Sequence, residues 1–307
     1  MSDTKPHAKH FPIKKTPMLP KGTFSGRTAL VTGGGTGLGK GMALMLGTLG
    51  ASVAIMGRRQ NVLEKTAAEL ASQSGSKILA CSGDVRDPSA VKAAVDKIEK
   101  ELGLPTLIVN NAAGNFISPT ERLSPNAVKT IIDIVLGGTV NITMDIAKRL
   151  IAAQKSASFL SITTTYCYRG SGFVVPSASA KAGVENMMRS LASEWGRYGI
   201  RLNCLSPGPI WAEDSGAWGR LDPTGKFKKL ALDKLPIGRC GDPHEIANLA
   251  TYILSDYASF MTGETVLLDG GELCYGAGEF NFLTHVTNEQ WDQMEKMIRD
   301  TNKKSKK

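Results

Sequence analysis

Short apolar runs recur along the chain from about residue 27 to residue 270, and segments with helical spacing of apolar positions separate them. Runs so short and so uniformly apolar are typical of strands covered on both faces, as in a parallel sheet between layers of helices. No linker interrupts the alternation, which favours one large α/β domain over two small ones. The predicted strands are Ala29–Thr32, 52–56, 77–82, 107–110, 158–163, 201–206 and 265–270.

Seven strands in this order match a doubly wound nucleotide-binding architecture. We expect the domain over residues 26–275, after a flexible N-terminal arm at 1–25 and before a C-terminal extension at 276–307. Between the sixth and seventh strands, residues 211–238 are irregular and rich in glycine and proline, which suits a lid over a substrate. One predicted helix begins at about Gly39, and the others cover about 60–73, 88–102, 126–152 and 178–196.

The composition is that of a globular protein with a sizeable core, since 42% of the 307 residues are hydrophobic and 21% are charged. The formal net charge of +9 indicates either a solvated basic surface or attraction to a polyanionic ligand. A phosphorylated cofactor together with a phosphate-bearing substrate suits the second interpretation. The basic residues are scattered and are not grouped with aromatic residues, so nucleic acid is not an expected partner.

The positions of the cysteines and histidines and the lengths of the apolar runs indicate the compartment and argue against a metal site and a membrane span. The five cysteines lie far apart in no C-x-x-C pair, and the histidines do not cluster, so we expect a reducing intracellular compartment and no metal site. No apolar run approaches the roughly 20 residues that span a bilayer, so no membrane span is expected. The first 26 residues hold five lysines and Asp3 but no arginine, and prolines interrupt them, which is unlike a matrix-targeting segment.

The segment TGGGTGLG, from Thr32 to Gly39, places glycines directly between the first strand and its helix. In that context glycines let the backbone approach a pyrophosphate, and the helix N-terminus supplies amide donors. The sequence therefore predicts a single doubly wound, Rossmann-type α/β domain with a seven-stranded parallel sheet. The predicted dinucleotide-binding residues of this turn are Gly33, Gly34, Gly35, Thr36, Gly37 and Leu38.

The end of the second strand indicates which dinucleotide is bound. An acidic residue there would bind the ribose 2′-hydroxyl, whereas this chain has MGRRQ, with Arg58 and Arg59. A guanidinium can bind a phosphate through two hydrogen bonds, so NADPH is favoured over NADH. Asp84 is expected to accept hydrogen bonds from the adenine edge, with a helix N-cap as its alternative. The sixth strand ends in SPGPI and would pass beside the nicotinamide with Pro207, Gly208, Pro209 and Ile210.

TGxxxGxG, NNAxG, a helix lysine and PGPI, in this order, resemble the short-chain dehydrogenase/reductase family over about residues 26–272. The resemblance implies that Lys181 holds the cofactor ribose and lowers the pKa of a catalytic tyrosine one helical turn earlier. Here Ser177 stands in the tyrosine position, Thr164 in the usual serine position, and Gly137 in the usual asparagine position. A serine hydroxyl is too weak an acid to replace the phenol.

Tyr166 offers another source for that phenol. It lies just past the fifth strand, ahead of the glycine-bearing segment RGSG, on the side of the sheet expected to face the cofactor. The alternative is that Tyr166 or Tyr168 merely packs at the end of the strand, and the residues alone favour this alternative.

Longer segments resemble the mitochondrial 2,4-dienoyl-CoA reductases, among them NNAAGNFISPTERLSPNA, SITTTY, GSGFVVPSASAKAGVE, RLDPTG and GEFN. This resemblance implies that the catalytic tyrosine is Tyr166, that Asn115 joins it in holding a thioester oxygen, and that Ser177 supports one of them. It also implies a homotetramer built through the helices at 126–152 and 178–196, and a mitochondrial location, with the cytoplasm as the alternative. The residues expected to contact an acyl-CoA are Arg86, Phe116, Ser124 and Arg220, with surface salt bridges as the alternative for the two arginines.

The implied reaction adds hydride from NADPH to the δ carbon of a 2,4-dienoyl thioester, and donors at the thioester oxygen stabilise the resulting dienolate. Water then protonates the α carbon and gives a 3-enoyl-CoA. Gly137 and a long WAEDSGAWGR segment in the lid depart from the family pattern. Two other hypotheses stay open: a 2-enoyl-CoA or 3-ketoacyl reductase on the same scaffold, and a non-catalytic NADPH-binding protein. The acyl chain length is not readable from the sequence.

Overall fold

The computed structural model describes residues 4–211, 226–278 and 280–304. Its centre is a seven-stranded, all-parallel sheet in the order β3-β2-β1-β4-β5-β6-β7, which confirms the predicted fold class. The order reverses between β1 and β4, and in such sheets ligands bind beyond the carboxyl ends of the strands at that point. The strands are β1 Thr28–Thr32, β2 Ser52–Gly57, β3 Ile78–Ser82, β4 Leu107–Asn110, β5 Ala157–Ile162, β6 Ile200–Pro207 and β7 Thr265–Leu268.

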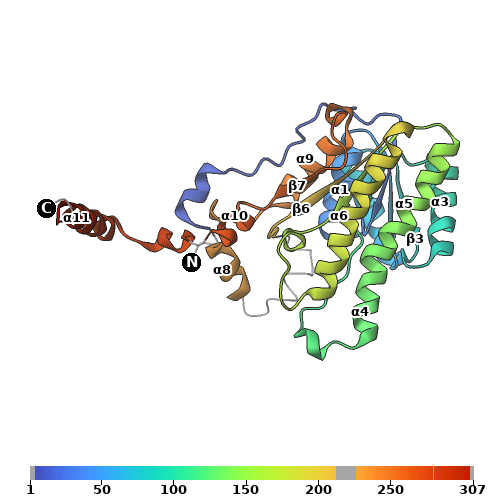
Figure 1. Cartoon of the computed structure of the whole chain (residues 1–307). Helices are drawn as coiled ribbons and strands as arrows, with labels where there is room; N and C mark the ends of the chain where they lie inside the picture. The colour runs from blue at the N-terminus through green and yellow to red at the C-terminus, as the bar shows by residue number, and fades with distance from the viewer. Residues whose placement is uncertain (1–3, 212–225, 279, 305–307) are drawn as a thin grey trace.

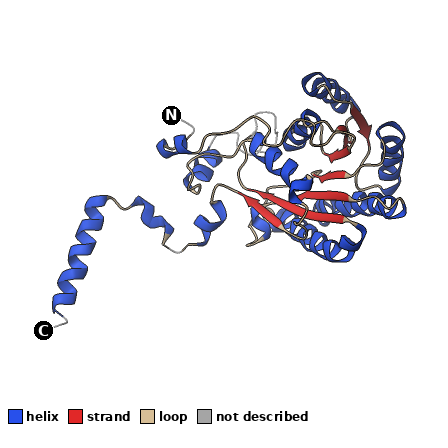
Figure 2. Ribbon diagram, turned by 90° about the horizontal axis from the view of Figure 1, so that it is seen from above, coloured by secondary structure: helices blue, strands red, loops and turns tan. Residues whose placement is uncertain are grey.

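Helices cover both faces of the sheet, as Figures 1 and 2 show. Each face of the sheet packs into its own apolar cluster, which is why the central strands are buried from end to end. One cluster holds α1 Gly37–Thr48, α2 Gln60–Ser74 and α9 Pro243–Leu254. The other holds α3 Pro88–Leu102, α4 Pro125–Ile132, α5 Gly138–Ala152 and α6 Val175–Trp195.

The predicted helix at 126–152 is interrupted. Between α4 and α5, Asp133–Gly137 forms a π-helical turn, so the chain is helical throughout but changes its side-chain register. By length and composition alone, the helical stretch Pro125–Ala152, with a hydropathy of 1.4, could cross a membrane. In the fold its apolar side chains Ile131, Val135, Ile142 and Leu150 are buried in the core.

The N-terminal arm, which the sequence predicts to be flexible, contacts the body of the domain. The backbone N–H of Lys5 donates to the Gly238 carbonyl over 2.8 Å, and Arg239 Nε donates to the Phe11 carbonyl over 2.8 Å. Phe24 is fully buried in the apolar cluster that holds α1, α2 and α9. The arm therefore holds the segment that follows α8 (Lys226–Asp233), at the C-terminal base of the predicted lid.

Several elements depart from the predicted boundaries. Strand β7 ends at Leu268 because the next residues turn into α10, Glu272–Ala277. Helix α9 was not predicted, although its capping box of Asp242 and Glu245 is readable in the sequence. Lid residues 212–225 lie outside the described part of the chain.

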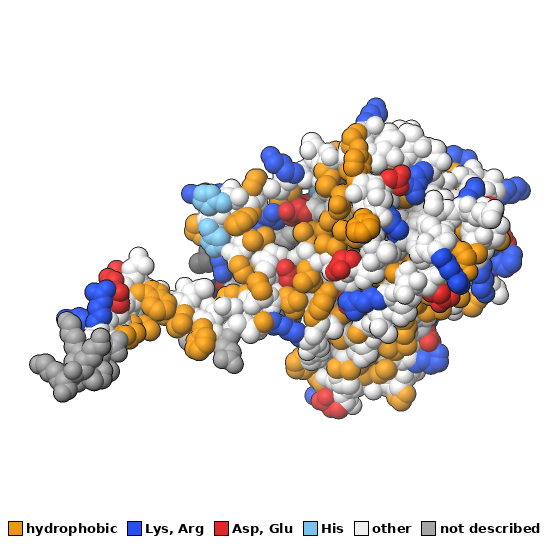
Figure 3. Space-filling view, turned by 45° about the horizontal axis from the view of Figure 1, so that its top comes forward, with side chains coloured by type: hydrophobic (Ala, Val, Ile, Leu, Met, Phe, Trp, Pro, Cys, Tyr) orange, Lys and Arg blue, Asp and Glu red, His pale blue; other side chains and the backbone are white. Residues whose placement is uncertain are grey.

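The C-terminal extension leaves the body of the molecule and ends in α11, Asn288–Lys304 (Figures 1 and 2). Hydrophobic side chains lie along it in the space-filling view of Figure 3. The exposed large ones are Phe280, Trp291, Met297 and Ile298.

Candidate active site

The glycine-rich turn connects β1 to α1 at the carboxyl edge of the sheet, and the neighbouring β4 holds it in place. Thr32 Oγ1 accepts hydrogen bonds from the backbone N–H groups of Asn111 and Ala112, over 2.9 and 3.0 Å. The side chain of Asn111 in turn donates to the Thr32 carbonyl over 3.0 Å. The NNAAG segment therefore fixes the turn that the sequence assigns to the pyrophosphate.

This turn has the shape that a dinucleotide requires. A Cβ at Gly39 would collide with the Gly33 carbonyl oxygen, and a Cβ at Gly34 would lie 2.7 Å from the side chain of Ile55. Gly33 has a positive φ of 66°, which favours glycine. With the N-terminus of α1 directly after it, the turn can present backbone amides to a phosphate. These residues fit a dinucleotide cofactor.

Two arginines and one aspartate meet beyond β2 and β3. Arg86 forms an ion pair with Asp84, Nη2 to Oδ2 over 2.6 Å, and this contact lowers the pKa of the Asp84 carboxyl. Arg58 lies close enough to lower the same pKa further. Asp84, predicted to bind adenine, and Arg86, predicted to bind the acyl-CoA, thus bind each other. This agrees with the alternative that Arg86 forms a surface salt bridge. The N-cap alternative for Asp84 is wrong, because Asp87 caps α3 by accepting from the Ser89 N–H.

The displaced phenol and the serine on the helix come together. Tyr166 Oη lies 2.9 Å from Ser177 Oγ, and either hydroxyl can be the donor. Tyr166 belongs to a short 3-10 turn, Thr165–Cys167, directly after β5, whereas Ser177 is in the first turn of α6. Ser177 is buried and Tyr166 is half-buried, so the phenol reaches the site from the strand side and occupies the space beside the helix.

Lys181 lies one turn further along α6, on the same face as Ser177. It is buried, and its Nζ donates a hydrogen bond to the Ile162 carbonyl at the end of β5. Burial lowers the pKa of the Lys181 ammonium from 10.5 to about 8. The lysine is therefore held at the carboxyl edge with its charge only partly compensated.

Glu185 continues the same face of α6 and was not anticipated, although its spacing of four from Lys181 is readable in the sequence. Burial raises the pKa of its carboxyl, and its Oε2 lies 3.7 Å from Arg189 Nη2. Among the described residues its Oε1 has no hydrogen-bond partner. Burial also raises the pKa of the Cys167 thiol to about 12, so this cysteine stays protonated.

The sequence does not decide whether Tyr166 or Tyr168 supplies the phenol, nor what Gly137 changes in its helix. Ser177 pairs with Tyr166 and not with Tyr168, and burial raises the pKa of the Tyr168 phenol. The structure thus favours Tyr166 over Tyr168 as the phenol of the site.

A Cβ at Gly137 would have only the Ile132 carbonyl within 4 Å, at 3.9 Å, so the π-helical turn has room for a side chain there.

Three of the residues predicted to hold the substrate, Asn115, Phe116 and Ser124, lie between β4 and α4. Asn115 and Phe116 are exposed on the loop after β4, and Ser118 N–H donates to the Phe173 carbonyl over 3.0 Å, which joins this loop to the one carrying Tyr166. Ser124 caps α4 by accepting from the Ala127 N–H over 3.1 Å. Arg220, the remaining predicted substrate residue, lies outside the described residues.

The PGPI segment closes the other side of the site. Gly208 N–H donates to the Leu268 carbonyl over 3.1 Å, and Pro209 accepts from the Gly241 N–H over 3.0 Å. A Cβ at Gly208 would lie 2.7 Å from the Asp269 backbone, so a larger residue would push the segment outward. Ile210 is buried beneath it.

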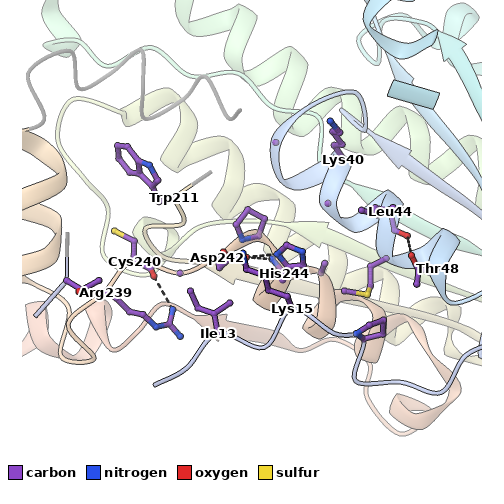
Figure 4. Close-up of a pocket in the computed structure, with 18 residues that line it drawn as sticks. Ile13, Lys15, Lys40, Leu44, Thr48, Trp211, Arg239, Cys240, Asp242 and His244 are labelled. Carbon is purple, nitrogen blue, oxygen red and sulfur yellow. Dashed lines mark hydrogen bonds and ion pairs between the residues drawn. The ribbon is translucent and has the colours of Figure 1, made fainter. Parts of the chain in front are cut away.

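A cavity of about 670 Å³ lies between the N-terminal arm, α1 and the start of α9 (Figure 4). Three of its basic side chains are paired: Lys40 with Glu69, Arg239 with Glu245, and His244 with Asp242. Tyr166, Ser177 and Lys181 do not line it, whereas Gly37 of the glycine-rich turn does. Within the described ranges, no group of three or more His, Cys, Asp or Glu side chains could hold a metal ion.

A glycine-rich turn at the switch point of a parallel sheet, with a phenol and a buried lysine beside it, defines a nucleotide-dependent oxidoreductase of the Rossmann type. A family profile described as enoyl-(acyl carrier protein) reductase matches residues 33–272. The chain therefore belongs to the short-chain dehydrogenase/reductase family.

Similar proteins cover nearly the whole chain. A Caenorhabditis elegans protein named probable 2,4-dienoyl-CoA reductase 3, (3E)-enoyl-CoA-producing, is 48% identical over an alignment of 307 positions that covers 97% of each chain. A zebrafish peroxisomal 2,4-dienoyl-CoA reductase is 34% identical over 267 residues, covering 86% of this chain and 87% of its own. A solved gluconate 5-dehydrogenase from Burkholderia cenocepacia, in complex with NADP and tartrate, is 27% identical with a TM-score of 0.76, covering 81% of this chain and 96% of its own.

Proposed function

We propose that this protein is an NADPH-dependent 2,4-dienoyl-CoA reductase, which converts 2,4-dienoyl-CoA thioesters to trans-3-enoyl-CoA during β-oxidation of unsaturated fatty acids. The observation that carries the proposal is the pairing of Tyr166 Oη with Ser177 Oγ over 2.9 Å. It supplies a phenol where the helix offers only a serine. The similarity to the C. elegans reductase, 48% identical over nearly its full length, supports the same substrate class.

The cofactor would lie across the carboxyl edge, with the turn from Gly33 to Leu38 at its pyrophosphate and Lys181 at its ribose. When bound, NADPH supplies the hydride. Arg58 and Arg86 together carry one more charge than Asp84 compensates, so this corner favours a 2′-phosphate over a free hydroxyl. NADPH, and not NADH, is therefore the proposed cofactor.

Tyr166 and Asn115 would hold the thioester oxygen of the substrate. For Tyr166 Oη to donate to that oxygen, Ser177 Oγ must donate to Tyr166 Oη, and the buried Ser177 hydroxyl is positioned to do so. Such a chain of hydrogen bonds polarises the phenol and strengthens its donation to a developing negative charge. The cationic Lys181 acts in the same direction. Water delivers the proton to the α carbon, and a 3-enoyl thioester leaves.

Substrate contacts would follow from the same placement. Phe116 is exposed on the loop that carries Asn115 and offers an apolar surface to the acyl chain. Arg86 lies at the protein surface, where it can exchange part of its pairing with Asp84 for a CoA phosphate. Arg220 and Ser124 complete the proposed acyl-CoA contacts.

The two other hypotheses make different predictions. A 3-ketoacyl reductase forms an alkoxide and needs the tyrosine that position 177 lacks. A non-catalytic binding protein would bind NADPH without turnover. The test is to incubate the protein with NADPH and 2,4-hexadienoyl-CoA, 2-hexenoyl-CoA or 3-ketohexanoyl-CoA in parallel, and to identify the products by mass spectrometry and NMR. Turnover of the dienoyl thioester alone, with a 3-enoyl product, supports the proposal, and turnover only of either other thioester overturns it.

The proposed assembly is a homotetramer formed through α4 and α5 together with α6. Light scattering after size exclusion tests it, and a monomer at micromolar concentration would contradict it. The proposed location is the mitochondrion, which rests on the resemblance to the mitochondrial reductases, with the cytoplasm as the alternative. Imaging of a C-terminally tagged chain against mitochondrial and peroxisomal markers decides this point, since the zebrafish relative is named as peroxisomal.

A further inference from the structure

The tyrosine of this site lacks the support that a helix would give it. Tyr166 lies in a single 3-10 turn, Thr165–Cys167, and the loop that follows contains Phe173 with a positive φ of 67°. A side chain on a helix is oriented by packing on both sides along the helix, whereas a residue in one isolated turn depends on a few side-chain contacts. The orientation of Tyr166 must therefore be fixed from outside its own turn.

Helix α10 supplies contacts on both sides of Tyr166. Thr165 Oγ1 donates to Glu272 Oε2 over 3.2 Å, and Thr165 is buried. Three residues after Tyr166, the guanidinium of Arg169 donates to the Leu273 carbonyl. A Cβ at Gly276 would lie 3.2 Å from Arg169 Nη1, so this side chain lies close against the helix.

The start of α10 is itself fixed to the end of β7. Asp269 Oδ1 accepts from the Gly271 N–H over 2.9 Å, and Asp269 Oδ2 accepts from the Leu273 N–H over 2.8 Å. Asp269 faces Gly208, whose missing Cβ leaves room for the aspartate backbone. A continuous set of contacts thus leads from the sheet through α10 to the turn that presents the phenol.

We propose that Glu272 is a positioning residue for Tyr166, and that α10 acts as a brace that holds the displaced phenol against Ser177. The proposal rests on the proposed function for its catalytic consequence, but the brace itself is a property of the fold. Burial raises the pKa of the Glu272 carboxyl, as expected for a side chain that points into the protein and not into solvent.

The test compares variants that break the Thr165–Glu272 hydrogen bond with variants that keep it. Glu272→Ala removes the acceptor and Thr165→Val removes the donor, whereas Glu272→Gln and Thr165→Ser retain them. Since one intramolecular hydrogen bond contributes about 1 kcal/mol, we expect each breaking variant to lower kcat roughly 3- to 10-fold. KM for NADPH should not change, because the cofactor turn lies elsewhere. The conservative variants should recover wild-type kcat.

A double variant, Thr165→Val with Glu272→Ala, separates a direct contact from two unrelated effects. If the two side chains act through one hydrogen bond, the double variant loses no more kcat than the stronger single variant. Multiplicative losses, or unchanged kcat in both single variants, would overturn the proposal. Thermal unfolding of every variant checks that the fold persists.

Amide hydrogen exchange gives a readout that does not depend on the reaction. Amides between residues 165 and 170 should exchange faster in Glu272→Ala than in wild type, and Glu272→Gln should restore their protection. If wild type turns over no dienoyl-CoA, the proposed function fails while exchange still tests the brace. If wild type is active and neither kcat nor exchange responds to Glu272→Ala, the brace is wrong and the function stands.

Discussion

Tyr166 Oη and Ser177 Oγ lie 2.9 Å apart although their residues come from different elements, one following β5 and the other beginning α6. The helix position that would carry a tyrosine in a related reductase is taken by a smaller side chain, and the space so freed admits a phenol from the opposite side. The lysine one turn further along remains at the same edge of the sheet.

Removal of the serine hydroxyl should weaken catalysis and spare cofactor binding. Ser177→Ala leaves Tyr166 Oη without the donor that polarises it, and we expect kcat to fall roughly 3- to 30-fold, as for the loss of one to two kcal/mol of hydrogen bonding. Ser177→Thr keeps the hydroxyl and is the matched control. Steady-state kinetics check this, and an equal loss in both variants would show that packing, not the hydroxyl, is responsible.

Cofactor affinity should depend on pH through Lys181. Its pKa is lowered to about 8 by burial, so the ammonium loses its proton as the pH rises through that value in the free protein. Because an anionic cofactor binds the charged form better, the Kd for NADPH should rise with pH above about 8. Titrations of protein fluorescence across that range measure it.

Lys181→Arg is the control, since a guanidinium stays charged across the range, and its Kd should show no such rise. Lys181 also affects the stability of the fold, and here a rise in pH is favourable. Burial penalises the charged lysine in the fold, so the unfolded chain binds more protons between pH 8 and 10.5, and stability rises with pH in that window. A flat Kd in wild type would contradict this account of Lys181.

Arg58 should set the preference for NADPH over NADH. Arg58→Asp replaces a phosphate-binding charge by a carboxylate that can bind a ribose hydroxyl. We expect affinity for NADPH to fall roughly 10- to 100-fold, in keeping with a charged hydrogen bond of about 1.5–3 kcal/mol, while affinity for NADH increases. Arg58→Lys keeps the positive charge but not the paired donors of the guanidinium. Its affinity for NADPH should therefore lie between those of wild type and Arg58→Asp. Unchanged preference in Arg58→Asp would assign the 2′-phosphate to other residues.

Two adjacent glycines at the π-helical turn should respond oppositely to alanine. Gly137 has open space beside it and a helical φ, so Gly137→Ala should raise the free energy of unfolding by about 0.5–1 kcal/mol. A Cβ at Gly138 would lie 2.5 Å from Val85 Cγ2, and Gly138→Ala should lower stability by about 1–3 kcal/mol through overpacking. Urea denaturation of the pair measures both, and destabilisation by Gly137→Ala would contradict the open space.

The sequence predicted the fold because the fold depends on local signals, whereas the choice of Tyr166 came from the resemblance to the dienoyl-CoA reductases. Apolar runs and a glycine turn specify the sheet and its switch point, and the short spacing between Tyr166 and Ser177 keeps them near each other. Pairings between distant segments were not readable. The contact between Thr165 and Glu272 spans 107 positions, and no periodicity links the two residues.

Other differences have equally physical causes. The N-terminal arm lacks the periodicity of a regular element, yet two hydrogen bonds join it to the body: Lys5 N–H donates to the Gly238 carbonyl, and Arg239 Nε donates to the Phe11 carbonyl. Asp84 and Arg86 were assigned to separate ligands because the sequence does not show that a spacing of two after a strand lets them pair. The choice between Tyr166 and Tyr168 depends on which phenol lies beside Ser177, and only the structure shows this.

The measurement that tests the central claim most directly is the rate of NADPH oxidation with 2,4-hexadienoyl-CoA by wild type and by Tyr166→Phe, with Tyr168→Phe as the control. Loss of the phenol that donates to the thioester oxygen should lower kcat by roughly 100- to 1000-fold, as for removal of one oxyanion donor, without loss of NADPH binding. Tyr168→Phe should retain activity. Full activity in Tyr166→Phe would contradict the displaced-phenol mechanism.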